Sequence, residues 1–316
     1  MFNDSTYNKY SVYLKDKYGE KVYKLPVNIP VSCPNRENGY GGCTYCDDQG
    51  AGFENLSGTI LVGEQLRKNM VYIGTKYKAN KFIAYFQNFT NTYLPLNKFK
   101  EYISQVTDEN IVEIAVSTRP DCVRGEYLEV LKEVQYNKGV DITIELGVQS
   151  TNFRTLEKIN RGHTLAEYID AMMQIKSYGF NICTHMILNL PWDDEKDVIE
   201  GAKILSSLKT DFVKLHGLYI VEGTKMATEF QAGEFEICSV DEYKKRVISF
   251  LRYLSPDIYM QRLIGRAPKE GTLFANWDSS WWKIHDEIEN EMKEKGFKQG
   301  DLFTYLGGEK VKKFIK

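Results

Sequence analysis

The sequence has no run of eighteen or more apolar residues, the length that a membrane-spanning helix needs. Its first 21 residues contain no apolar stretch like the core of a signal peptide. A strong charge of either sign is also missing, because 41 basic residues face 43 acidic ones and the formal net charge is −2. This balance gives no overall attraction for nucleic acid and leaves only a local basic surface for that role. We therefore expect a cytoplasmic protein with no membrane segment.

Cysteine is scarce as well, with six in 316 residues. In the reducing cytoplasm, clustered cysteines usually indicate metal binding or catalysis rather than disulfides. Cys122, Cys183 and Cys238 lie far apart and each stands beside an apolar run. We interpret these three as small buried hydrophobic residues.

The other three cysteines share one loop, residues 32–50, with the sequence SCPNRENGYGGCTYCDDQG. Nine residues separate Cys33 from Cys43, and two separate Cys43 from Cys46. Pro34 and three glycines disfavour regular structure there and allow the backbone to close around a small group. The loop therefore suits a metal centre.

Three thiolates favour a particular centre, because a four-iron cluster held by three cysteines keeps one iron open to another ligand. A structural zinc site requires a fourth ligand, and the next twenty residues offer no second Cys or His pair. A thioredoxin-type pair would explain Cys43 and Cys46 but would leave Cys33 without a role. On spacing alone the open cluster is favoured, and the zinc and redox alternatives stay open.

Elsewhere, short apolar runs alternate with amphipathic patterns of helical period. Such an alternation specifies a parallel sheet with helices outside it. Counting the first strand, six units predict an α/β fold, a partial (β/α)6 TIM-like barrel. The expected strands are 21–31, 81–87, 111–117, 142–148, 181–188 and 211–218, and the expected helices are 59–77, 96–106, 125–137, 164–178 and 194–208.

The chain is expected to have three parts. Residues 1–20 show no clear period and are predicted to be an N-terminal extension, and residues 21–265 form the barrel. Residues 266–316 are predicted to be an irregular and helical extension that packs on the barrel and includes a charged helix over 283–295.

Reactive groups in parallel α/β folds gather at the carboxyl ends of the strands. The cysteine loop directly follows the first strand, so we expect it at that edge. The segments expected beside it are 87–90, 117–120, 149–150, 189–192 and 217–219.

Four motifs together resemble the radical S-adenosylmethionine (SAM) enzymes: the C-x9-C-x2-C loop, AYFQNFTNTY (84–93), ELGVQS (145–150) and NRGHT (160–164). Within them the chain is similar to small stand-alone bacterial proteins of the branch whose radical domain is like that of the Elongator catalytic subunit. The resemblance spans about residues 7–265.

This resemblance implies a [4Fe–4S] cluster on Cys33, Cys43 and Cys46, with SAM chelating the free iron. An electron from a reducing donor, such as a flavodoxin or a ferredoxin, would split the C5′–S bond and give a 5′-deoxyadenosyl radical. The protein would contribute placement and the exclusion of water.

The resemblance also implies cofactor contacts. Gln149 corresponds to a ribose-binding position, and Arg161 to the residue that pairs with the methionine carboxylate. Without the motif, Arg161 would be interpreted as a solvated arginine at a helix start. QNFTNT (87–92) replaces the common Gly-Gly-Glu, and NLPW (189–192) replaces GLPG. The full predicted set is Gln87, Asn88, Thr90, Ser117, Glu145, Gln149, Ser150, Arg161 and His185.

Three further residues are predicted to act on the substrate. His185 and His216 lie on the fifth and sixth strands, and Lys214 shares the face of His216 by strand period. The alternative for each histidine is a satisfied core residue. His163 is predicted to orient the start of the following helix.

Relatives in this branch act on the wobble uridine of transfer RNA, so the resemblance implies modification of the substituent at carbon 5 of that base in an anticodon loop. A basic rim and aromatic faces would then contact RNA. Alternatives are a radical SAM enzyme acting on a small metabolite or a protein side chain, and a non-catalytic iron–sulfur or zinc protein. The candidate RNA contacts are Arg67, Lys68, Lys76, Lys78, Lys81, Tyr85, Phe86, Trp277, Trp281 and Trp282.

Overall fold

The computed structural model describes residues 5–37, 39, 41–47, 55–266, 271–312 and 314. Residues 38, 40 and 48–50 of the predicted cysteine loop therefore lie outside the described part. The chain divides into two compact units. The cysteine unit consists of Ser11–Val148 and Asn160–Cys183, and the C-terminal unit consists of Met1–Tyr10, Gln149–Ile159 and Thr184–Lys316. The three-part division expected from the sequence stays a prediction.

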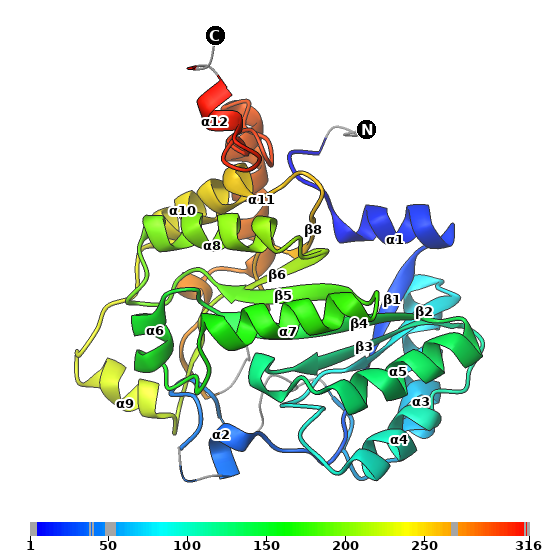
Figure 1. Ribbon diagram of the computed structural model, residues 1–316. Helices are drawn as coiled ribbons and strands as arrows, with labels where there is room; N and C mark the ends of the chain where they lie inside the picture. Colours follow the sequence, from blue (N-terminus) through cyan, green and yellow to red (C-terminus); the bar gives the residue numbers. More distant parts are fainter. Residues whose placement is uncertain are drawn as a thin grey trace. The chain divides into compact units, whose positions relative to one another are not determined.

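The cysteine unit is built on parallel strands whose interior residues are buried. The register pairs Leu25 with Ala84, Tyr85 with Ala115, and Ser117 with Glu145. Helices follow the strands along the outer side of this part of the sheet (Figure 1). The strands are β1 (Val22–Val27), β2 (Lys81–Phe86), β3 (Ile111–Thr118) and β4 (Asp141–Gln149), and the helices are α3 (Val62–Tyr77), α4 (Leu96–Ser104), α5 (Gly125–Lys138) and α7 (Leu165–Ser177).

The C-terminal unit contains a parallel pair of strands, an antiparallel pair and several helices. Strands β6 (Phe212–His216) and β8 (Tyr259–Arg262) are parallel, and β7 (Ile220–Val221) pairs antiparallel with β9 (Thr272–Phe274). The helices are α6 (Phe153–Lys158), α8 (Glu195–Ser207), α9 (Lys225–Gln231), α10 (Val240–Tyr253), α11 (Trp281–Glu294) and α12 (Glu309–Lys312).

The described strands of the large sheet have the order β1-β2-β3-β4-β5-β6-β8, with β5 spanning Asn181–Ile187. This alternation of strands and helices confirms the predicted partial TIM-like barrel. Strand β8 (Tyr259–Arg262) extends the sheet beyond the six expected units.

The segment 1–20, which shows no clear period in the sequence, contains helix α1 (Tyr10–Tyr18), and contacts distant in sequence hold this helix: the Tyr18 hydroxyl donates to Asp141 at 2.6 Å. One local prediction was wrong. The cysteine loop, predicted to be without regular structure, contains helix α2 (Pro34–Glu37). Pro34 is compatible with that helix because the first turn of a helix needs no backbone N–H donor there.

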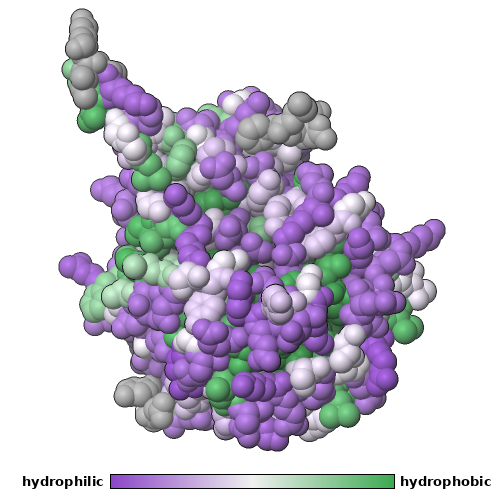
Figure 2. Space-filling model, turned by 45° about the vertical axis from the view of Figure 1, so that its right-hand side comes forward, coloured by the Kyte–Doolittle hydropathy of each residue, from purple (hydrophilic) through white to green (hydrophobic). Residues whose placement is uncertain are grey.

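The visible face of the molecule is largely hydrophilic, and hydrophobic side chains show as separate areas on it (Figure 2). No helix in the described ranges is both long and apolar enough to cross a bilayer.

Candidate functional site

The cysteine loop begins just after β1 and folds back on itself. The carbonyl of Cys33 accepts from the amides of Arg36 and Glu37 at 2.9 and 3.3 Å, so Cys33 stands at the start of α2. The Cys46 amide donates to the Cys43 carbonyl at 3.0 Å. Cys33 and Cys43 are buried and Cys46 is half-buried. The loop therefore holds three sulfurs that are mostly shielded from solvent.

Each of these three sulfurs has one guanidinium nitrogen beside it. Arginine keeps its positive charge at any relevant pH, and hydrogen bonds from a charged donor are strong. Three cations therefore compensate the negative charge that three thiolates would carry. The sulfur–nitrogen pairs are Cys33 with Arg119 Nη1 at 3.6 Å, Cys43 with Arg161 Nη1 at 3.3 Å, and Cys46 with Arg36 Nη1 at 3.8 Å.

The arginines are themselves held in place. Arg119 uses Nε and Nη2 to bind both carboxylate oxygens of Asp121 at 2.9 and 2.7 Å, which directs Nη1 to the sulfur. Arg161 donates from Nη2 to the Gly147 carbonyl at 2.6 Å. Arg161 is buried, so the alternative of a solvated helix-start arginine is wrong. Its Nε atom is buried and has no hydrogen-bond partner in the described part of the chain.

The NRGHT segment clamps the cysteine loop from the other side. The Asn160 amide donates to the Gly42 carbonyl at 2.7 Å, and the Asn35 amide donates to the Asn160 carbonyl at 2.6 Å. Gly162 has φ +75°, and a Cβ there would lie 2.6 Å from Asn35 Oδ1 and 3.0 Å from Arg119 Nη2. A side chain at that position would therefore push the loop and the arginine apart.

The following helix fixes the end of this segment. Thr164 caps α7 in a reciprocal capping box with Glu167. His163 places Nε2 3.3 Å from the Gly147 carbonyl, the same oxygen that Arg161 binds. Burial and the charge of Arg161 lower the pKa of His163 to about 3, so the ring is neutral. His163 thus lies where the sequence predicted, at the start of the helix.

The distances between the three sulfurs distinguish a single zinc ion from a four-iron cluster. A tetrahedral zinc with bonds of about 2.3 Å would bring its sulfurs to within about 3.8 Å of one another. Among the described residues, the three sulfurs do not all lie within 4.8 Å of each other. A four-iron cluster places each cysteine on a separate iron, so its cysteine sulfurs lie farther apart than those around one zinc ion. The donor set therefore fits a cluster better than a single zinc ion.

Burial, followed by the charge of Cys43, raises the pKa of the Cys46 thiol to about 11, although Arg36 opposes that rise. Cys46 itself is therefore not an activated nucleophile, because activation requires a lowered pKa.

Several predicted cofactor residues lie at the same edge of the sheet. The Thr90 amide donates to the Ser32 carbonyl at 3.3 Å, which ties this segment to the cysteine loop, and the Gln87 amide donates to Val27 at 3.2 Å. Asn88 is 4% exposed; its amide nitrogen donates to Asn28, and its Oδ1 is buried without a partner within the described ranges.

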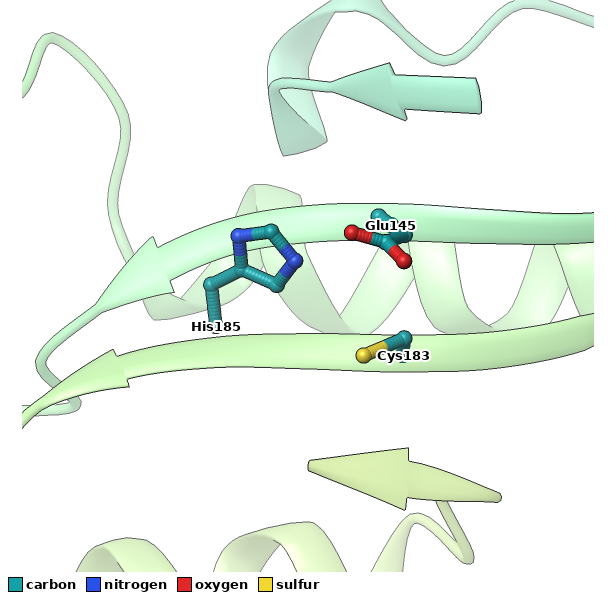
Figure 3. Close-up of side chains that lie close together, drawn as sticks. All are labelled: Glu145, Cys183 and His185. Atoms are coloured by element: carbon teal, nitrogen blue, oxygen red, sulfur yellow. The ribbon is translucent and has the colours of Figure 1, made fainter. Parts of the chain in front are cut away.

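Ser117 and Glu145 lie deeper in the sheet. Ser117 donates to the Tyr85 hydroxyl at 3.1 Å. Glu145 is fully buried and forms an ion pair with Lys24. Figure 3 shows Glu145 on β4 and Cys183 on β5, with His185 two residues farther along β5. Lys24 therefore neutralises the Glu145 carboxylate within the protein, without a ligand.

The remaining predicted residues belong to the C-terminal unit. Gln149 has φ +74°, which is unusual for a residue other than glycine, and the buried Ser150 hydroxyl accepts from the Asn152 amide at 3.0 Å. The rings of His185 and His216 lie 5.0 Å apart, and Lys214 is buried. The unit therefore brings the two predicted histidines together.

The predicted RNA contacts are only partly placed as expected. Lys78 caps the end of α3 and Lys81 begins β2, and both lie toward the end of the strands opposite the cysteine loop, so a basic rim built on them is wrong. Phe86 is fully buried and Tyr85 is 5% exposed, so neither can stack on a base. Lys68 pairs with Glu64 at 2.7 Å, as on a solvated helix.

Two of the three candidate tryptophans have free faces. Trp281 and Trp282 are 43% and 57% exposed at the start of α11. Trp277 donates from its indole to the Cys238 carbonyl at 2.7 Å and packs on Tyr243. The half-buried Trp277 is therefore held in the C-terminal unit by both its indole nitrogen and its ring.

Fold and site together define a partial α/β barrel with a three-cysteine loop after its first strand, in which each sulfur lies beside an arginine. Residues 27–204 match the family model of the radical SAM superfamily, and residues 210–294 match the Radical_SAM C-terminal domain. The chain belongs to the radical SAM superfamily, whose members use a [4Fe–4S] cluster and SAM.

Particular relatives cover nearly the whole chain. The uncharacterized protein MJ0486 of Methanocaldococcus jannaschii is 36% identical over 93% of this chain and 92% of its own length. YtqA of Bacillus subtilis is 30% identical over 96% of this chain and 94% of its own length. Both confirm the predicted branch.

More distant matches extend to the Elongator-like proteins. The tRNA uridine(34) acetyltransferase of M. jannaschii is 27% identical over 49% of this chain and 28% of its own length. The structure of Methanocaldococcus infernus Elp3 with an N-terminal deletion superposes with a TM-score of 0.69 at 15% identity, covering 90% of this chain and 68% of that one. This superposition supports the fold.

The sequence analysis missed Asp193, which directly follows NLPW. Asp193 is 6% exposed and accepts a hydrogen bond from the Thr155 hydroxyl. Burial raises the pKa of Asp193 to about 6, although hydrogen bonds from Thr155 and Ser150 oppose the rise. A buried carboxyl that titrates near neutrality weakens the fold as it ionises.

We predict that Asp193→Asn stabilises the protein at pH 7.5 by up to about 3 kcal/mol and has no effect near pH 4. The folded-state pKa lies above the unfolded one, so wild-type stability is highest when Asp193 is protonated and falls as the pH rises from about 4 to 6. Urea unfolding of both proteins at pH 4, 5.5 and 7.5 measures this, with the exposed Asp16→Asn as the control. A stability difference that does not change with pH would contradict it.

Proposed function

We propose that this protein is a radical SAM enzyme in which Cys33, Cys43 and Cys46 hold the [4Fe–4S] cluster. The observation that carries the proposal is the pairing of each sulfur with its own arginine. A cluster with three thiolates is anionic, and a buried anion needs nearby cations to be stable. When bound, the cluster would supply the electron for reductive cleavage of the C5′–S bond of SAM.

The proposed SAM contacts use groups that lack partners in the described chain. Arg161 Nε is available to the methionine carboxylate, which matches a guanidinium well. The buried Asn88 Oδ1 is an acceptor for the methionine amino group, in a segment without the common Gly-Gly-Glu. Gln149 is proposed for the ribose, because an amide both donates and accepts. A flavodoxin or ferredoxin is the proposed electron donor.

The proposed substrate is a wobble uridine of transfer RNA that carries a substituent at carbon 5. Support comes from the partial match to a protein named as a tRNA uridine(34) acetyltransferase, and this match covers about half of the chain. Trp281 and Trp282 offer exposed indole faces for unstacked bases. The proposed roles of His185, His216 and Lys214 in the chemical step depend on this substrate.

Replacing any one of the three loop cysteines with alanine is predicted to remove most of the iron, because two remaining thiolates anchor a four-iron cluster poorly. Iron and sulfide are counted in anaerobically reconstituted protein. Cys238→Ala, a half-buried cysteine outside the loop, is the control and should retain full iron. Full iron content in Cys46→Ala would contradict the assignment.

Arg119→Gln is predicted to lower the reduction potential of the cluster by on the order of 50–100 mV, because a positive charge beside the Cys33 sulfur favours the reduced, more negative state. The potential is measured by a redox titration followed by electron paramagnetic resonance. Arg124→Gln, an exposed arginine of the same unit, should leave it unchanged. An equal potential at equal iron content in Arg119→Gln would show that Arg119 does not act on the cluster.

The substrate proposal is tested by nucleoside analysis of transfer RNA from cells with and without the protein. We expect one 5-substituted uridine to be lost and its precursor to accumulate when the protein is absent. Cells that express the Cys43→Ala variant should match the deletion. Identical nucleoside profiles would exclude transfer RNA as the substrate and would leave the radical chemistry open.

A further inference from the structure

In the C-terminal unit, Arg262 has no counter-charge in the described part of the chain. This residue ends β8 and pairs in register with Lys214 of β6. Its Nε donates to the Leu215 carbonyl at 3.1 Å and its Nη2 to His216 Nδ1 at 2.6 Å. No carboxylate in the described ranges forms an ion pair with it. A half-buried guanidinium that is positioned but not neutralised is suited to an anionic ligand.

A hydroxyl without a partner lies beside this guanidinium. Tyr219 Oη is buried and has no hydrogen-bond partner in the described residues. A Cβ on Gly265 would lie 2.6 Å from Tyr219 Oη and 3.0 Å from Arg262 Nη2, so the two groups converge at this glycine. A buried hydroxyl that makes no hydrogen bond is costly and calls for an explanation.

The chemistry of the neighbouring groups is that of donors. Burial raises the pKa of Tyr219 to about 12, so the hydroxyl keeps its proton. A guanidinium has no acceptor, so His216 Nδ1 must accept from Arg262, which leaves the ring proton on Nε2. The ring of His185 lies against that of His216 and helps to fix its position.

We propose that Arg262, Tyr219 and His216 form a subsite that binds an oxyanion of the substrate, either a carboxylate or a phosphate. The fork of Arg262 matches two oxygens of either group, Tyr219 adds a neutral donor, and His216 positions the guanidinium. Gly265 keeps the space between the guanidinium and the hydroxyl open. The identity of the substrate rests on the proposed function, whereas the subsite can be tested without it.

The first experiment uses the cluster-loaded protein under anaerobic conditions. Thermal unfolding is measured in sodium phosphate, sodium acetate and sodium chloride at equal ionic strength. A ligand of the folded state raises the melting temperature, so phosphate or acetate should raise it above the chloride value in wild type. The rise should disappear in Arg262→Gln and shrink in Gly265→Ala, whose added methyl displaces the flexible ends of Tyr219 and Arg262.

Arg252→Gln is the matched control, because Arg252 lies in the same unit and already pairs with Asp301 at 3.0 Å. It should keep the wild-type response. Arg262→Lys, which retains the charge but not the fork, should give a reduced response and replaces Arg262→Gln if that variant does not fold. The subsite is wrong if neither anion stabilises wild type, or if Arg262→Gln responds as wild type does.

The second experiment separates the two sources of the oxyanion. Binding is measured to an anticodon stem-loop RNA with uridine at the wobble position, and to the same RNA with 5-carboxymethyluridine there. A loss of about tenfold or more in Arg262→Gln for both RNAs assigns a backbone phosphate, and a loss for the second RNA alone assigns the carboxylate. If wild type binds neither RNA, the transfer RNA proposal fails, while the anion response of the first experiment still decides the subsite.

Discussion

The site depends on the mutual neutralisation of three sulfurs and three guanidinium groups. Three thiolates held close together would repel one another, and the buried Arg161, which has no carboxylate partner among the described residues, would lose hydration without compensation. The thiolates and the arginines therefore compensate each other's buried charge. Because the arginines come from the loop itself, from the end of β3 and from the turn before α7, the pairing requires the parallel register of the sheet.

That dependence explains what could be predicted from the sequence. The loop cysteines, the alternation of strands and helices, and the NRGHT motif are local patterns, and they led to the correct fold class and family. The contact between Arg119 and Cys33 joins residues 86 positions apart. No spacing rule signals it, because it arises only when two strand ends meet at one edge.

Other misses have equally physical reasons. Helix α1 buries only Tyr10 and Leu14 well and shows a weak apolar period, so its stability comes from partners such as Asp141. Phe86 was predicted to contact RNA as an aromatic face, but its side chain is fully buried in the core, which its residue type alone does not show. Asp193 resembles an ordinary turn residue until its burial is known.

Both units contain buried polar atoms that lack hydrogen-bond partners in the described part of the chain. In the cysteine unit the buried Glu145 already has Lys24, whereas Arg161 Nε and Asn88 Oδ1 lack partners in the described part of the chain. In the C-terminal unit Tyr219 Oη also lacks a hydrogen-bond partner, and the neighbouring Arg262 has no carboxylate partner among the described residues. These three atoms are among the buried polar atoms without partners in the described residues, and at each of them ligand binding rather than folding would complete the hydrogen bonds.

The most direct test of the central claim is the cleavage of SAM. Anaerobic protein with a full complement of iron and sulfide is reduced, mixed with SAM, and assayed for 5′-deoxyadenosine by chromatography. The account predicts that wild type releases 5′-deoxyadenosine and methionine and that Cys46→Ala releases neither. A fully loaded, reduced wild-type protein that leaves SAM intact would contradict it.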